Sequence, residues 1–445
     1  MKRILGLCLT LILVVTLVSC GNQNFSFEEE TLKSRSQECM NRFLQKDFDG
    51  VEAMVKRSSR SKLNAGSLQQ AWEQTGEKLG AFVRFVSADV ETDGKNATVV
   101  LVTAFENNGI AATFSFDSNY EIKALYMNYR SIVGELNTET QTYTQQEIKI
   151  GDGEEPLTGA LTLPKGVVNP PVVLFVHGSG ATDLNESVGA ADNRPFEDLA
   201  YGLAKQGIAS IRYDKRNYAY PETFRKLGKQ VTIEDEVLND VHAAVAYAQT
   251  LTTVDTSRIY VLGHSMGGML APKIAQDNPA VSGLVIMAGS PRRLEDIVFD
   301  QNKMLLDQTQ QSQAQKDRTL REVEAEVQKI KELKPGVSAD MIFNMPAAYW
   351  VSLNEIDTES IAKSLSVPML IQQGSADFQV YADKDYLLWQ QVLEGKENVQ
   401  FRLYDGLNHL FMKNNGKQDA TEYDIKGHVE QQVIDDIGAF ILQKK

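Results

Sequence analysis

The 445-residue sequence has few cysteines, few histidines and a shortage of positive charge. It contains 3 Cys and 5 His, and two of the cysteines, Cys8 and Cys20, fall in the first twenty residues. Only Cys39 remains beyond them, so thiol catalysis, cysteine zinc sites and a disulfide framework are excluded, and we expect Cys39 to pack in a core. Lys and Arg number 45 against 59 Asp and Glu, a formal net charge of −14. Such an acidic chain excludes nucleic acid as a partner and electrostatic adhesion to anionic membranes.

One long apolar run is present, and it lies at the start of the sequence. Lys2 and Arg3 precede an uncharged stretch from Ile4 to Val18, which leads into Leu17-Val-Ser-Cys20. The run is shorter than the roughly 20 residues of a membrane-spanning helix, and its pattern resembles bacterial lipoprotein signals. The resemblance implies a signal peptide over residues 1–20, lipid on Cys20, and an exported protein anchored to the bacterial cell membrane. An uncleaved anchor or plain secretion is the alternative.

The length of the chain favours two domains. Over residues 25–130 helical patterns come first and strands follow, with Thr98 to Phe105 and Ile110 to Phe116 joined by a hairpin signal, Glu-Asn-Asn-Gly. This order predicts a small α+β domain. The stretch from Trp72 to Phe82 resembles cone-like, nuclear-transport-factor-type domains found ahead of some bacterial hydrolases, which implies a spacer or substrate-shaping role. Residues 131–142 are polar and lack periodicity, which predicts a linker.

Residues 143–445 predict a second domain of the α/β class. After a β-hairpin over 146–163, apolar strands alternate with helices, at 172–176, 208–213, 259–262, 284–287, 369–372 and 399–404. Near-continuous apolar strands separated by helices predict a mostly parallel sheet covered by helices on both faces. In such sheets the loops at the carboxyl ends of the strands carry the site.

One connection in this domain is much longer than a single crossover helix requires. Residues 290–366 carry mostly helical patterns, which predicts a helical lid inserted beside the site. Its large apolar residues could line an acyl or aryl pocket, although apolar residues at helical spacing usually pack against one another. The residues concerned are Met341, Phe343, Met345, Tyr349 and Trp350.

The pattern Gly-His-Ser-Met-Gly over 263–267 lies between an apolar strand and a helical pattern. Its two glycines leave room for a sharp strand-to-helix turn, at which a serine hydroxyl is exposed for nucleophilic attack. Ser265 is therefore the candidate nucleophile. We expect the helix, at Met269 to Gln276, to point its N-terminus at the site, so that the amide of Met266 stabilises an oxyanion. An ordinary strand-to-helix turn is the alternative.

Three further patterns appear in the order found in one large family. His177-Gly-Ser-Gly180 follows a strand, Gly374-Ser-Ala-Asp377 follows another, and Leu407-Asn-His409 lies near the end of the chain. With the serine motif, they make the second domain resemble the α/β-hydrolase superfamily, near its dienelactone-hydrolase-like and acyl-esterase branches. The resemblance spans about residue 145 to the end. It implies a catalytic triad in the chain order nucleophile, acid, base.

That order leaves His409 and His428 as candidate bases, because both follow Ser265. His428 is at the start of a predicted helix, whereas His409 is in a loop at the carboxyl edge of the sheet, and His409 is favoured. Asp377 is the favoured acid, with the role of orienting His409 and stabilising its cation. Asp405 is the rival, although Asp405-Gly406 has the composition of a turn. Two further acidic residues, Asp383 and Asp385, look like helix-start residues.

By resemblance, the amide of Ser179 is the second oxyanion donor, and His177 and His264 belong to the scaffold. Related hydrolases carry a similar Arg-Tyr-Asp-Lys-Arg after a strand, and we expect the charged residues of this cluster to form a solvated ion-pair network; they are Arg212, Asp214, Lys215 and Arg216. The loop Thr182-Asp-Leu-Asn-Glu186 departs from the more acidic run of relatives with this layout, which puts any role for it in doubt.

Together these patterns predict a membrane-tethered serine esterase. It would cleave small carboxylic esters, of short to medium acyl chains, through an acyl-enzyme at Ser265, with no metal and no organic cofactor. Peptide or amide cleavage is an alternative, because prolyl-peptidase relatives share the fold, although they commonly have a larger partner domain. A binding lipoprotein with a vestigial hydrolase fold is the other alternative.

Overall fold

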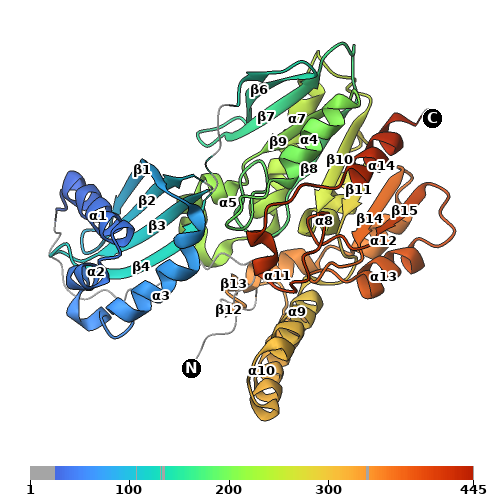
Figure 1. Cartoon of the computed structure of the whole chain (residues 1–445). Helices are drawn as coiled ribbons and strands as arrows, with labels where there is room; N and C mark the ends of the chain where they lie inside the picture. The colour runs from blue at the N-terminus through green and yellow to red at the C-terminus, as the bar shows by residue number, and fades with distance from the viewer. Residues whose placement is uncertain (1–25, 107, 131, 133–135, 337–339, 444–445) are drawn as a thin grey trace.

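The computed structural model describes residues 26–106, 108–130, 132, 136–336 and 340–443 (Figure 1). The predicted signal peptide and its lipidation site, Cys20, lie outside the described residues. Within the described part of the chain, no helix has both the length and the apolar character needed to cross a membrane.

The N-terminal part combines helices with an antiparallel sheet, as the order of patterns predicts. Its helical elements are α1 (Glu29–Leu44), α2 (Phe48–Met54), η1 (Arg57–Ser59), α3 (Ala65–Thr75) and η2 (Glu77–Leu79). Its strands pair in the order β1 (Phe82–Thr92), β2 (Ala97–Phe105), β3 (Gly109–Phe116) and β4 (Ile122–Tyr129). Helices and sheet enclose one apolar core that includes Phe43, Trp72 and Phe114. Cys39 is buried in this core, and burial raises the pKa of its thiol to about 12, which suits a packing role.

The second part is built on a nine-stranded, mostly parallel sheet, which confirms the predicted α/β class. In spatial order the strands are β15 (Val399–Tyr404), β14 (Met369–Gly374), β11 (Val281–Met287), β10 (Ile259–His264), β8 (Val172–Val176), β9 (Ala209–Tyr213), β7 (Leu157–Pro164), β6 (Tyr143–Ile150) and β5 (Thr138–Glu139). The strands from β15 to β9 pair in parallel, and the last three are antiparallel. β5 falls inside the stretch predicted as a linker. It extends the sheet because Thr138 and Glu139 pair with β6.

The two faces of the sheet are covered by different helices, and each face has its own apolar core. One core contains residues of α7 (Asn239–Thr250) and α8 (Met266–Asp277), and the other those of α4 (Pro195–Lys205) and α14 (Gln431–Leu442). β9 lies beside β8 on one side, and the next strand in the chain, β10, lies beside β8 on its other side. The direction of winding therefore reverses between β8 and β10, and ligands bind at such a switch point in open α/β sheets.

The long insertion forms a helical arm and a pocket wall. Its elements are α9 (Leu294–Gln308), α10 (Gln313–Glu332), β12 (Met341–Ile342), β13 (Met345–Pro346), α11 (Ala347–Asn354) and α12 (Thr358–Ser364). In Figure 1, α9 and α10 lie side by side and project from the body of the molecule. The remaining short helices are α5 (Arg216–Ala219), α6 (Pro221–Leu227), η3 (Gly228–Gln230), η4 (Glu234–Leu238), η5 (Ala382–Tyr386), α13 (Leu387–Val392) and η6 (Ala420–Asp424).

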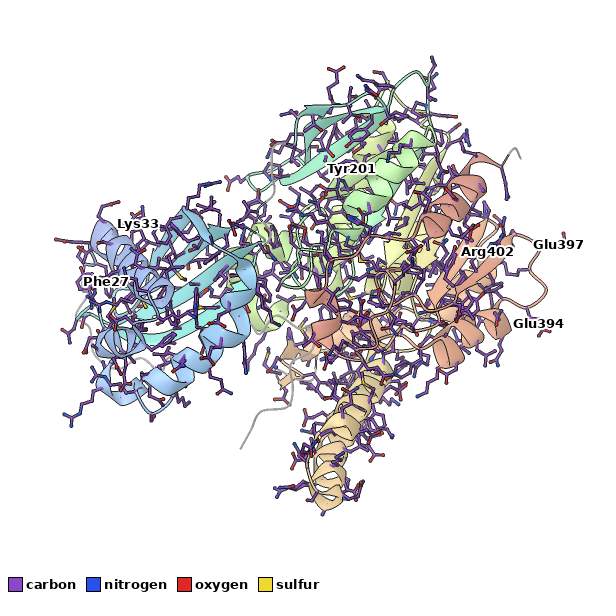
Figure 2. All side chains as sticks on the ribbon, in the orientation of Figure 1. Phe27, Lys33, Tyr201, Glu394, Glu397 and Arg402 are labelled. Atoms are coloured by element: carbon purple, nitrogen blue, oxygen red, sulfur yellow. The ribbon has the colours of Figure 1, made fainter. Side chains whose placement is uncertain are left out.

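Two residues of the charged cluster at the end of β9, Arg212 and Lys215, are buried and the other two are partly buried, so the predicted solvated network is wrong. Arg212 is 0% exposed, and its guanidinium donates to the side-chain oxygens of Asn185 and Gln145. The guanidinium carbon, Cζ of Arg212, lies 5.4 Å from the centroid of the Tyr201 ring. Tyr201 is on α4 and is labelled in Figure 2. Because Arg212 is buried and these partners are neutral, the cation is stabilised by hydrogen bonds rather than by water.

The other three charged residues of this cluster have separate partners. Lys215 Nζ lies 2.7 Å from Glu236 Oε1, and Arg216 lies 2.6 Å from Asp240. Asp214 instead accepts a hydrogen bond of 2.8 Å from the backbone N–H of Leu184. Burial is the main cause that raises the pKa of Asp214 to about 7. The negative charge of Asp183 raises this pKa further, and the hydrogen bond from Leu184 lowers it.

The raised pKa of Asp214 predicts a pH-dependent cost to stability. Below about pH 3.8 the carboxyl is protonated in both the folded and the unfolded chain and does not lower the free energy of unfolding. As the pH rises to about 7, only the unfolded chain ionises, so stability falls and stays lower above pH 7. We expect Asp214→Asn to raise the Tm by about 2–4 °C at pH 8 and not at pH 3.5. The exposed Asp405→Asn is the control; equal shifts for both variants, or a gain at pH 3.5, would contradict the account.

Candidate active site

Ser265 occupies a strained turn between β10 and α8. Its backbone has φ 55° and ψ −117°, a conformation that non-glycine residues rarely adopt. The amide of Ser265 donates to Met287 O over 2.9 Å, and α8 begins at Met266, three residues earlier than the sequence predicts. The earlier start brings the first turn of the helix, with its unpaired amides, next to the serine.

The glycines of the serine motif are required by close backbone contacts. A Cβ on Gly263 would lie 2.2 Å from the carbonyl oxygen of Gly267, and one on Gly267 would lie 2.2 Å from that of Val176. A Cβ on Gly268 would lie 2.9 Å from Cα of Gly289, which follows β11. The strand end, the turn and the helix therefore approach one another more closely than side chains allow.

His409 and Asp377 form a buried pair at the carboxyl edge of the sheet. His409 Nδ1 lies 2.7 Å from Asp377 Oδ2, and both residues are almost fully buried. Asp377 Oδ1 accepts from the amides of Gln379 and Val380, and Oδ2 also accepts from Gln373 Nε2. These bonds fix the carboxylate, and they leave Nε2 of His409 as the nitrogen that can exchange a proton with a reactant.

The rival candidates lie elsewhere. Asp405 is exposed, and its carboxylate accepts from Ser375 Oγ, in the loop after β14, over 3.1 Å. His428 precedes α14, its side chain is 73% exposed, and it contacts Asp198. Asp385 is not simply a helix-start residue: it is fully buried and bonds Arg292 over 2.8 Å, which connects the start of the insertion to η5. Asp383, by contrast, lies in η5 at the molecular surface.

His264 connects the serine turn to the His409 loop. Its Nε2 lies 2.9 Å from the carbonyl oxygen of His409, and the two imidazole rings are 4.7 Å apart. Among the described residues no hydrogen bond joins the Ser265 hydroxyl to His409. Catalytic hydrogen bonds are often long in free enzymes and shorten when substrate binds.

Sequence reasoning missed Glu186, in the loop whose role it left in doubt. Glu186 Oε1 accepts from the amide of Gly178 over 2.6 Å, and Oε2 lies 2.8 Å from His264 Nδ1. Burial acts to raise the pKa of the Glu186 carboxyl, but attraction to His264 and His177 together with the Gly178 hydrogen bond brings the pKa below its usual value. For His264 burial acts to lower the pKa, but attraction to Glu186, the bond to His409 O and the charge of Asp377 together raise it above its usual value. A buried His264 next to the nucleophile requires a polar partner, but nothing in the sequence indicates that this partner is Glu186.

The predicted oxyanion donors flank the serine. A Cβ on Gly178 would lie 3.1 Å from Ser265 Cβ and 3.6 Å from Ser265 Oγ, so the loop after β8 runs directly beside the nucleophile. Ser179 and Met266 line the same pocket as Ser265. Within the described residues, neither the amide of Ser179 nor that of Met266 donates to a protein acceptor. His177 belongs to the scaffold: its Nε2 lies 3.0 Å from Asp183 O, and burial lowers its pKa to about 4.

The pocket beside Ser265 is mostly apolar and has a volume of about 120 Å³. Of the five insertion residues for which lining and packing were both left open, four line the pocket, namely Met341, Met345, Tyr349 and Trp350. The fifth, Phe343, instead packs its ring against Trp350 with centroids 6.3 Å apart. The lining also contains Phe224 and Val231, which follow the charged cluster in the sequence and were not predicted to take part.

Comparisons with known proteins agree with this architecture. Residues 171–415 match the family described as serine aminopeptidase, S33, and residues 36–125 match a family described as a protein of unknown function. Esterase EstD from Thermotoga maritima is 32% identical over 403 residues, which cover 89% of this chain and 92% of EstD.

Solved structures are more distant. Est1E from Butyrivibrio proteoclasticus is 18% identical with a TM-score of 0.42, over 66% of this chain and 97% of its own. A dienelactone hydrolase from Anabaena variabilis is 15% identical with a TM-score of 0.40, over 68% of this chain and 98% of its own. By the family match over more than half of its length and by its similarity to EstD along almost all of it, the chain belongs to the serine aminopeptidase S33 family of α/β-hydrolases.

Proposed function

We propose that this protein is a serine esterase that cleaves carboxylic esters through an acyl-enzyme. The observation that carries the proposal is the convergence at one sheet edge of a strained Ser265, two unpaired amides and the His409–Asp377 pair. The similarity to a protein named an esterase supports esters as the substrates.

The proposed chemistry divides one difficult step into two. Ser265 Oγ attacks the ester carbonyl while His409 Nε2 accepts its proton, and the amides of Met266 and Ser179 bind the oxyanion. The tetrahedral intermediate collapses, and His409 returns the proton to the leaving alcohol. Water then attacks the acyl carbonyl while His409 accepts its proton, the bond to Ser265 Oγ breaks, and His409 gives the proton to Oγ as the acid leaves. Asp377 keeps His409 in the correct tautomer throughout, and no step requires a metal or cofactor.

The apolar pocket supports a preference for short to medium acyl chains. Engineered cavities of about 150 Å³ hold benzene, so a site of about 120 Å³ suits a small acyl group. Its Met266 and Met269 walls are flexible side chains that adapt to different shapes. Longer chains would have to displace Met345 or Trp350 of the insertion.

Cleavage of peptides or amides is the second candidate, because the matching family is described as serine aminopeptidase. The same serine, base and amides would serve an amide bond. Assays of matched ester and aminoacyl-anilide substrates, run in parallel on the full chain, separate the two activities by their kcat/KM.

We also propose that Cys20 carries lipid and tethers the enzyme to the bacterial cell membrane. The support is the sequence pattern alone, a basic start, a short apolar run and Leu-Val-Ser-Cys. Several acyl chains on one cysteine give stable anchoring without help from the acidic surface of the protein.

Ser265→Ala is expected to lower kcat by about 10⁴-fold or more on a chromogenic butyrate ester, because the acyl-enzyme cannot form. The wild type should hydrolyse acetate, butyrate and octanoate esters faster than palmitate. His428→Gln is the control and should keep the wild-type rate. An alanine variant as active as the wild type would refute the assignment of the nucleophile.

Asp377→Asn is expected to reduce kcat by about 10⁴-fold, since the amide leaves His409 in the wrong tautomer. Asp405→Asn, the matched change in the neighbouring turn, should leave kcat unchanged. Steady-state kinetics on both variants decides between the two carboxylates. Loss of activity in the Asp405 variant with activity kept in the Asp377 variant would exchange their roles.

Cys20→Ser is expected to abolish incorporation of labelled palmitate and to move the protein from the membrane fraction to the soluble fraction of the cells that express it. Cys8→Ser, which changes a cysteine inside the apolar run, should retain label and location. Incorporation of labelled palmitate into the Cys20→Ser protein would contradict Cys20 as the lipidation site.

A further inference from the structure

The loop that carries the second oxyanion donor is held from two sides by buried charged groups. The amide of Gly178 donates to Glu186 Oε1 over 2.6 Å, and the carbonyl oxygen of Gly178 accepts from Lys215 Nζ over 2.8 Å. Both charged residues are almost fully buried. The two peptide planes on either side of Gly178 are therefore fixed directly beside the nucleophile.

The bond from Lys215 determines where the Ser179 amide points. Gly178 C=O and Ser179 N–H belong to one peptide unit, and the described part of the chain contains no cis peptide bond. In a planar trans peptide the C=O and N–H point to opposite sides. With the oxygen held toward Lys215, the N–H is directed away from Lys215, and it has no protein acceptor among the described residues.

The ammonium group of Lys215 is itself held in place. Its second partner is Glu236 Oε1, at 2.7 Å, and Glu236 also accepts from Asn217 Nδ2 over 3.2 Å. Lys215 is 3% exposed, so a cation there is stable only because it is paired. A cation on the carbonyl also polarises the peptide, which makes its N–H a stronger donor.

We infer that Lys215 is a positioning residue for the oxyanion hole, which orients the Gly178–Ser179 peptide so that the Ser179 amide meets the charge that develops on the substrate carbonyl. The inference rests on the proposed esterase function. It gives the buried Lys215–Glu236 pair a role in the reaction that a structural salt bridge would not have.

Lys215→Met tests the inference because methionine keeps the length of the side chain and removes the donor. We expect kcat to fall about 10–100-fold, as for a weakened oxyanion donor, with KM changed by less than about threefold. Affinity for a trifluoromethyl ketone, whose adduct carries the oxyanion, should fall with kcat/KM. Arg216→Met is the matched control: it breaks the adjacent Asp240 pair without touching Gly178 and should lower the Tm but not kcat.

The double variant Lys215→Met/Glu236→Gln separates positioning from charge balance. It removes the unpaired carboxylate that the single variant leaves buried, so its Tm should recover relative to Lys215→Met. Its kcat should remain as low as that of the single variant. A double variant with wild-type kcat, or a folded Lys215→Met with wild-type kcat and inhibitor affinity, would overturn the inference. Failure of the proposed function would appear differently, as wild-type protein that does not react with a fluorophosphonate.

Discussion

The site depends on a backbone conformation that serine does not favour. Ser265 has a positive φ because β10, α8 and the end of β8 approach within distances that only glycine permits at 263 and 267. Strain of this kind costs on the order of 1–3 kcal/mol and persists only where the surrounding structure enforces it. The parallel sheet does so here, because the amide of Ser265 is held by Met287 O of the neighbouring strand. The nucleophile is therefore positioned by the core of the domain rather than by a mobile loop.

Around this turn, loops from distant parts of the chain are joined by buried polar contacts. His264 bonds the backbone of the His409 loop, Glu186 bridges His264 and Gly178, and Lys215 holds the other end of the Gly178 peptide. Each contact is shielded from water, which strengthens it and makes the loss of one partner costly. The oxyanion loop, the nucleophile and the base loop are thus held as one unit. We regard this coupling as the reason that a small apolar pocket and a few side chains suffice for the proposed reaction.

Much of this organisation could be predicted from sequence, and the exceptions have physical reasons. Apolar runs mark the strands of a buried parallel sheet directly, and the four motifs fall at strand ends, so Ser265, Asp377 and His409 all follow the carboxyl ends of parallel strands. The burial of Arg212 and Lys215 was not predicted, because charged residues are normally solvated and their partners, such as Asn185 and Glu236, are remote in sequence. The role of Glu186 was missed for the same reason. Local patterns predict elements, whereas pairing between loops depends on the tertiary fold.

The central claim is that Ser265 carries the acyl group during turnover. The most direct measurement is intact-mass and peptide-mapping mass spectrometry on the full chain after reaction with a fluorophosphonate and, separately, after rapid quenching with an ester substrate. The account predicts one covalent adduct per chain, located on Ser265, in both experiments. An unmodified protein, or an adduct on any other residue, would contradict it.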